Sequence, residues 1–178
     1  MRFVQAGVFV LRAQDQYRRS ALVELPGLRP ITAMAWVGFA LLVGTQGVGI
    51  WQIDPSGNHV QISDVDGFVV ALAADDEAVY AVGARSGRQR LVRFPLTAPQ
   101  QLVDLVEPGT LGDVTDVLVA DGMLFLTDFH KGRVFALRDE TLREVITGLS
   151  TPAALTQASD GTIYVAEFQR GAVARILP

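Results

Sequence analysis

The amino-acid sequence predicts an all-β protein built from one repeated unit of about forty residues. Four segments share the same order of apolar strand, tight turn, apolar strand, glycine-containing turn and apolar strand, and they start at Ile31, Phe68, Val114 and Pro152. The glycines of the second turns are spaced 40, 45 and 39 residues apart: Gly47, Gly87, Gly132 and Gly171. A partial fifth copy surrounds Gly7. A four-stranded unit that repeats at this period is typical of a β-propeller, in which each unit is one blade.

The strands of each blade are named a to d from the centre of the propeller outwards. Strands a and b are joined by tight turns, of which Asp121-Gly122 and Asp160-Gly161 have the residues that such turns favour. Asp75-Asp76 and Val37-Gly38 stand at the equivalent positions of two other repeats. A short strand d is predicted after each strand c, at residues 21–25, 59–63, 101–105 and 143–147.

Two segments fit another structure when they are taken alone. Residues 140–149 can be drawn as an amphipathic helix, but the equivalent segments of the other repeats read as strands, so we predict a strand. Residues 31–51 contain no charge and have the length of a membrane-spanning helix. They align with three repeats that do carry charges, and we therefore predict strands a, b and c of one blade.

The strand count predicts one domain over residues 1–178, with about five blades of which the first and last are incomplete. We expect strands b, c and d before Pro30, three complete blades over residues 31–147, and strands a, b and c over residues 152–177. Both ends supply strands b and c, so they do not complete one blade together. Unpaired apolar edges favour association. We therefore expect a partial propeller that another copy or a different protein chain completes, and no free-standing monomer.

Charge and composition weigh against several classes of partner and site. Nineteen acidic residues against fifteen basic ones give a net charge of −4, which disfavours a nucleic-acid partner and an anionic membrane surface. The absence of cysteine excludes disulfides, thiolate metal sites and a cysteine nucleophile. No signal-peptide pattern follows Met1. We expect a cytoplasmic location and no membrane span.

A pattern runs through all three strands of the last repeat. The residues that carry it are Leu149, Pro152, Asp160-Gly161, Ile163, Tyr164-Val165-Ala166-Glu167, Gly171, Val173 and Arg175-Ile176. This pattern resembles the repeats of NHL proteins and of the SMP-30/gluconolactonase family, less closely over residues 121–137 and weakly before residue 100. The resemblance implies a β-propeller, a fold that carries enzymes, receptors and scaffolds alike.

Enzymes similar to SMP-30 bind a divalent cation through Glu, Asn and Asp on different inner strands. The single asparagine of this chain, Asn58, lies in a predicted turn, and only Asp113 and Asp116 can face the channel from an inner strand. Two carboxylates on one strand do not make a cage of oxygen ligands, so we expect no metal site and no cofactor. The alternative function remains an SMP-30-like or lyase-like enzyme, with Asp113, Asp116, Asp128 and Glu167 near the channel mouth.

Asp128 and Glu167 hold equivalent positions at the ends of two b strands, 39 residues apart. Such a pair can perform acid–base chemistry or bind a cation. We favour a structural role, in which each carboxylate accepts backbone N–H groups of the b–c turn. His59 and His130 both lie in predicted turns, and no serine in a nucleophile turn accompanies them, so no catalytic triad is predicted.

In propellers the b–c and d–a loops share one face of the molecule, and the candidate binding residues gather there. They are Arg85, Arg88, Phe129, His130, Lys131, Phe168 and Arg170. Arginine and aromatic side chains dominate the energetics of protein interfaces. The opposing hypothesis places both phenylalanines beneath their turns, against the next blade. We expect a binding or scaffold module without catalytic activity, whose partner is another protein or a second copy.

Overall fold

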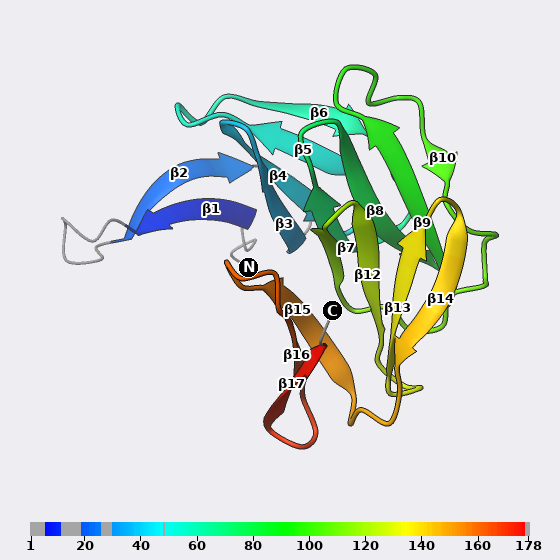
Figure 1. Ribbon diagram of the computed structural model, residues 1–178. Helices are drawn as coiled ribbons and strands as arrows, with labels where there is room; N and C mark the ends of the chain where they lie inside the picture. The colour runs from blue at the N-terminus through cyan, green and yellow to red at the C-terminus, as the bar shows by residue number, and fades with distance from the viewer. Residues whose placement is uncertain (1–5, 12–18, 26–29, 48, 177–178) are drawn as a thin grey trace.

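A computed structural model describes residues 6–11, 19–25, 30–47 and 49–176 of the chain. These parts form seventeen strands and five antiparallel sheets, and the strand order within each sheet follows the chain. The strands fan out around a centre, where β3, β7 and β15 lie (Figure 1). The fold is therefore all-β with the arrangement of a β-propeller, as the repeat predicts.

Four of the sheets are propeller blades. Blade I contains β3 (Ile31–Val37), β4 (Ala40–Thr45), β5 (Ile50–Ile53) and β6 (His59–Ser63). Blade II contains β7 (Phe68–Ala74), β8 (Ala78–Arg85), β9 (Arg88–Pro95) and β10 (Val103–Asp104). Blade III contains β11 (Val117–Ala120), β12 (Met123–Asp128), β13 (Arg133–Arg138) and β14 (Thr141–Ile146). Blade IV has three strands, β15 (Pro152–Gln157), β16 (Ile163–Glu167) and β17 (Ala172–Ile176).

The N-terminal sheet consists of β1 (Ala6–Leu11) paired with β2 (Arg19–Leu25). These strands stand where strands c and d of the first repeat are predicted, whereas the predicted strand b lies in residues 1–5, outside the described residues. Gly7 was expected in a turn, and this expectation is wrong. Gly7 lies within β1, opposite Glu24 of β2, because the pairing of the two strands continues through it.

Both ambiguous segments are strands. Residues 31–51 form β3, β4 and the start of β5, and β14 occupies the segment that also fits an amphipathic helix. The described part of the chain contains no helix of the length and apolarity that crossing a membrane requires. One predicted strand is much shorter than expected, because β10 contains only Val103 and Asp104.

The core lies between the blades rather than inside any one of them. Blades I and II enclose a cluster that includes Leu42, Val79 and Phe94, all fully buried. A second cluster joins blades II and III, a third joins blades III and IV, and a fourth joins the N-terminal sheet to blade I through Val8 and Val43. Each blade thus gains its apolar burial from its neighbours.

Polar side chains also join the blades near their inner strands. The Gln89 side chain of blade II donates from Nε2 to the carbonyl oxygen of Val114 at 2.8 Å and accepts the N–H of the same residue at 2.6 Å. Thr32 of blade I donates to the carbonyl oxygen of Val69 in blade II, and Thr115 donates to that of Pro152 in blade IV. These contacts satisfy backbone groups that the sheets leave unpaired.

The b–c and d–a loops share one face, as predicted. Gly132, in the turn between β12 and β13, has a φ of +64°, and its carbonyl oxygen accepts the N–H of Leu149 from the β14–β15 connection at 2.9 Å. A Cβ atom at this glycine would lie 2.3 Å from the Leu149 carbonyl oxygen. Glycine is therefore required here both by the turn and by the close approach of the two loops.

Replacing Gln89 with leucine tests the link between blades II and III. Gln89→Leu keeps the approximate shape but leaves the N–H and carbonyl of the buried Val114 without this partner. Because each unsatisfied buried group costs about 1–3 kcal/mol, we expect the free energy of unfolding to fall by about 2–4 kcal/mol. The control is Gln52→Leu at an exposed position of β5, which chemical denaturation should show to be nearly neutral. Equal losses for the two variants would contradict this role of Gln89.

Candidate functional site

The loop face, as we name it, consists of the b–c turns and d–a connections of blades II to IV. The β14–β15 connection lies between the turns of blades III and IV and bonds to both. Thr151 of this connection accepts the N–H of Phe168 at its carbonyl oxygen (3.0 Å) and the N–H of Gln169 at its hydroxyl oxygen (2.9 Å). Leu149 of the same connection bonds to Gly132. The backbone of the loop face is therefore held by hydrogen bonds from blade to blade.

Two aromatic rings from adjacent blades meet on this face. The ring centroids of Phe129 and Phe168 are 6.2 Å apart and the rings are tilted by 44°, and the Phe129 and His130 rings form an edge contact with centroids 5.4 Å apart. Phe129 is half-buried, whereas Phe168 is 73% exposed. The two phenylalanines therefore differ, and neither the exposed nor the buried hypothesis describes both of them.

Most of the charged candidates stand beside an acidic partner. Arg85 forms an exposed ion pair with Asp66, and Arg170 Nη1 lies 3.7 Å from Glu167 Oε2. His130 Nε2 is 3.2 Å from Asp113 Oδ2. Two further candidates, Arg88 and Lys131, are exposed. Arg88 lies opposite Arg85 in the backbone pairing of the β8–β9 hairpin. The loop face therefore carries mixed charge rather than a basic patch.

Three of the four carboxylates of the alternative, catalytic hypothesis bond to other segments within and between blades: Asp116, Asp128 and Glu167. Asp128 is fully buried and accepts the N–H of Lys131 at 3.2 Å and Nε of Arg133 at 3.1 Å. Glu167 accepts the N–H of Ser150 at 2.6 Å. Glu167 was expected to accept backbone N–H groups of its own b–c turn. Its hydrogen bond comes instead from Ser150, in the connection that precedes blade IV. A carboxylate that bridges a loop and a strand in this way fixes the backbone.

Asp116 links blade III to blade IV. Its Oδ2 accepts the N–H of Leu155 from β15 at 2.7 Å, and its Oδ1 accepts the N–H of Val117 at 2.9 Å. Burial raises the pKa of Asp116, and these two hydrogen bonds oppose that effect without cancelling it. Within the described residues, no group of three or more His, Cys, Asp or Glu side chains is placed to hold a metal ion.

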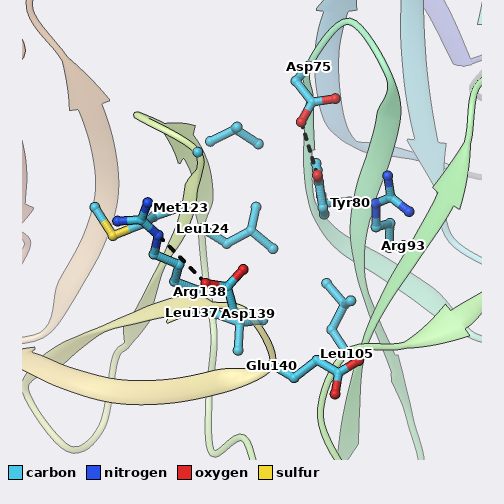
Figure 2. A pocket seen from close by; sticks show the side chains of 12 residues that line it. Asp75, Tyr80, Arg93, Leu105, Met123, Leu124, Leu137, Arg138, Asp139 and Glu140 are labelled. Carbon is cyan, nitrogen blue, oxygen red and sulfur yellow. Dashed lines mark hydrogen bonds and ion pairs between the residues drawn. The ribbon is translucent and has the colours of Figure 1, made fainter.

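A cleft of about 180 Å³ opens between blades II and III on the side opposite to the loop face. Figure 2 shows Asp75, Tyr80 and Arg93 on one wall, with Arg138 beside Asp139 on the other. Tyr80 donates to Asp75 Oδ2 at 3.0 Å. Partial burial would raise the pKa of Asp75, but hydrogen bonds from backbone N–H groups and from Tyr80 outweigh it, so the pKa is lowered.

The sequence analysis did not identify this cleft. Its lining comes from five strands and three turns of blades II and III, together with Leu105 after β10, so no local motif marks it. The backbone conformation of one lining turn is unusual: between β13 and β14, Asp139 and Glu140 both adopt positive φ angles, of +47° and +61°. Successive non-glycine residues in this conformation are uncommon. The charges of the cleft are mixed, and no single ligand chemistry follows from them.

No protein-family model and no curated protein sequence matches the chain. Solved structures do match it. TolB from Acinetobacter baumannii has a TM-score of 0.67 at 14% identity, over 90% of this chain and 46% of that one. The extracellular domain of the putative hybrid two-component system BT4673 from B. thetaiotaomicron has a TM-score of 0.62 at 10% identity, over 83% of this chain and 21% of that one. The computationally designed Ika8 protein has a TM-score of 0.57 at 20% identity, over 87% of this chain and 51% of that one.

These similarities support the β-propeller fold, and at such identities they carry the fold alone. In each of the three comparisons the chain spans about half or less of the matched protein.

The structural role of Asp128 can be separated from that of an exposed acid that binds the same arginine. Asp128→Ala should lower the free energy of unfolding by about 2–3 kcal/mol, somewhat less than the loss of a fully buried pair, because Arg133 keeps Glu144 at 2.6 Å. The matched variant Glu144→Ala removes the more exposed partner and should cost less than about 1 kcal/mol. Urea denaturation measures both. The brace would be refuted by an Asp128→Ala protein as stable as Glu144→Ala.

Proposed function

We propose that this protein is a non-catalytic binding or scaffold module that contacts a protein partner through the loop face. The observation that carries the proposal is the ring of Phe168, which is 73% exposed at the start of a turn whose backbone is fixed by Thr151. An exposed aromatic ring on a rigid backbone loses little conformational freedom when a partner covers it. Phe168 is therefore the anchor of the proposed interface.

The surroundings of Phe168 suit a protein surface. Phe129 supports the ring from the adjacent blade, and the exposed side chains of Lys131 and Arg170 flank the pair. A central aromatic contact within a polar and charged rim is the usual anatomy of protein interfaces. The face carries both signs of charge, because Asp113 lies beside His130. This arrangement favours a partner with its own mixture of charges over a polyanion.

Binding is a better explanation than catalysis because three of the four candidate carboxylates already bond to other parts of the fold. Asp116 and Glu167 bond to backbone N–H groups of neighbouring segments, and Asp128 bonds to both a backbone N–H and Arg133. A general base or a metal ligand needs a lone pair that can reach the substrate or ion. The oxygens of these three side chains already bond to other parts of the propeller.

We also propose two finer assignments of the fold. The N-terminal sheet represents strands c and d of a fifth blade, which its packing on blade I supports. Blade IV belongs to the NHL or SMP-30 type of repeat. Its Asp160-Gly161 turn supports this assignment, because Gly161 has a φ of +86° and Asp160 accepts the N–H of Thr162 at 3.0 Å.

The binding proposal is tested with Phe168→Ala and a control at an equally apolar exposed site, Val103→Ala on β10. The free energy of unfolding of each variant should lie within about 1 kcal/mol of that of the unchanged protein, because exposed side chains contribute little to stability. In affinity capture from cells of the source organism, with quantitative mass spectrometry, the protein and the Val103→Ala variant should retain the same partner. The Phe168→Ala variant should lose it at least tenfold.

Two results would contradict the proposal. One is a partner that Phe168→Ala retains as well as Val103→Ala does. The other is a loss of stability by several kcal/mol in Phe168→Ala, which would show that the ring belongs to the core.

A further inference from the structure

Two blade faces are left uncovered by the described residues. We name the side of a blade that faces the preceding blade its front, and the side that faces the following blade its back. On the front of blade I, the inner-strand residues Met34 and Trp36 are 59% and 60% exposed. On the back of blade IV, Val173 is 69% exposed. Elsewhere in the described chain, fronts and backs meet in buried clusters.

The contact between blades II and III shows what such faces do when they are covered. On the back of blade II, Ala71, Val82 and Leu91 form one row across three strands, and Ala73, Tyr80 and Arg93 form the next. Of these, Ala71, Ala73, Val82 and Leu91 belong to the buried cluster, and Tyr80 packs against it. Small residues on the inner strand thus leave room for the blade that follows.

The back of blade IV repeats this pattern position by position. Its first row is Ala154, Ala166 and Val173, and its second row is Thr156, Tyr164 and Arg175. Tyrosine and arginine recur at the same two positions as in blade II, and small or β-branched residues fill the others. The difference is in exposure, since Leu91 is fully buried whereas the equivalent Val173 is exposed. The back of blade IV is therefore built to receive the front of another blade.

The front of blade I has the same pattern of residues as the front of blade III, which packs against the back of blade II. On blade III, Val117, Leu126 and Phe135 form one row, followed by Val119, Leu124 and Leu137. The equivalent rows of blade I are Met34, Val43 and Trp51, followed by Trp36, Leu41 and Ile53. All these side chains are apolar. Val117 is 4% exposed, whereas its equivalent Met34 is 59% exposed.

The N-terminal sheet covers only the outer part of this front. Its residues Val8 and Val23 pack against Val43 and Ile53 of β4 and β5. A Cβ atom on Gly57, in the turn between β5 and β6, would lie 2.6 Å from the Leu22 carbonyl oxygen, so β2 lies over the outer strands. The inner strand β3 is left open. In the described residues blade IV contains three strands, β15, β16 and β17, of which β15 is the inner one.

We infer that the back of blade IV in one copy of the chain packs against the open front of blade I in a second copy. The interface repeats the inner-strand part of the blade II–blade III contact across two chains, with Met34 and Trp36 of β3 against Ala154 and Thr156 of β15. A second copy supplies both faces that the first one lacks, so one kind of contact covers both ends. The contact is heterologous, because two different faces meet. It uses none of the loop-face residues and stands independently of the proposed function.

The test is the mass of the purified chain at micromolar concentration, measured by light scattering and by sedimentation. The unchanged protein should have the mass of at least two chains. Trp36→Glu and Ala154→Glu, at exposed positions of the two inner strands, should each shift the mass to that of one chain, because each buries an unpaired charge in the interface. Val103→Glu places the same charge on an exposed valine of β10 and should leave the mass unchanged.

Mixing the two interface variants tests whether different faces meet. Trp36→Glu retains an intact back of blade IV, and Ala154→Glu retains an intact front of blade I, so the mixture should form a two-chain complex that neither variant forms alone. Met34→Lys should behave as Trp36→Glu does, which guards against a folding defect at one site. A monomeric unchanged protein, variants that remain associated, or a mixture that stays monomeric would each overturn the inference.

Discussion

The packing of one blade face against the next is the interaction on which the rest of the structure depends. Strands such as β8 are apolar on both sides, so a blade in isolation would expose both of these apolar faces to water. The contact includes polar hydrogen bonds as well as apolar rows, because Gln89 bonds to Val114 just before the inner strand of the next blade and Thr32 bonds to Val69 within it. A propeller of this kind is stable only as a series of neighbours.

This constraint also decides which residues are left for function. The carboxylates that a reader of the sequence would choose for chemistry, such as Asp116 and Asp128, hold segments together instead. The loops at one end of the blades are held by bonds from blade to blade, so a side chain on them has a fixed position. Phe168 is the exposed aromatic residue in that position. The same constraint leaves the outermost faces of the series open.

The repeat made the architecture predictable, because turn glycines and strand alternation are local signals. The face of the sheet on which each side chain lies was harder to predict. Irregular pairing shifts the register near the start of the inner strands, between Ile31 and Ala33, Val69 and Ala71, and Pro152 and Ala154. A shift of one residue exchanges the two faces of a strand. The unequal burial of Phe129 and Phe168 likewise depends on a neighbouring blade, which no local pattern describes.

Hydrogen exchange of two equivalent strands tests the dependence on neighbours most directly. β8 and β16 are both second strands with partners on each side, but β8 is covered on both faces and β16 on one. In the unassociated Trp36→Glu chain, amides of β8 should exchange much more slowly than those of β16, because opening β8 disrupts two packed faces. Equal exchange rates in the two strands, or slower exchange in β16, would contradict the account.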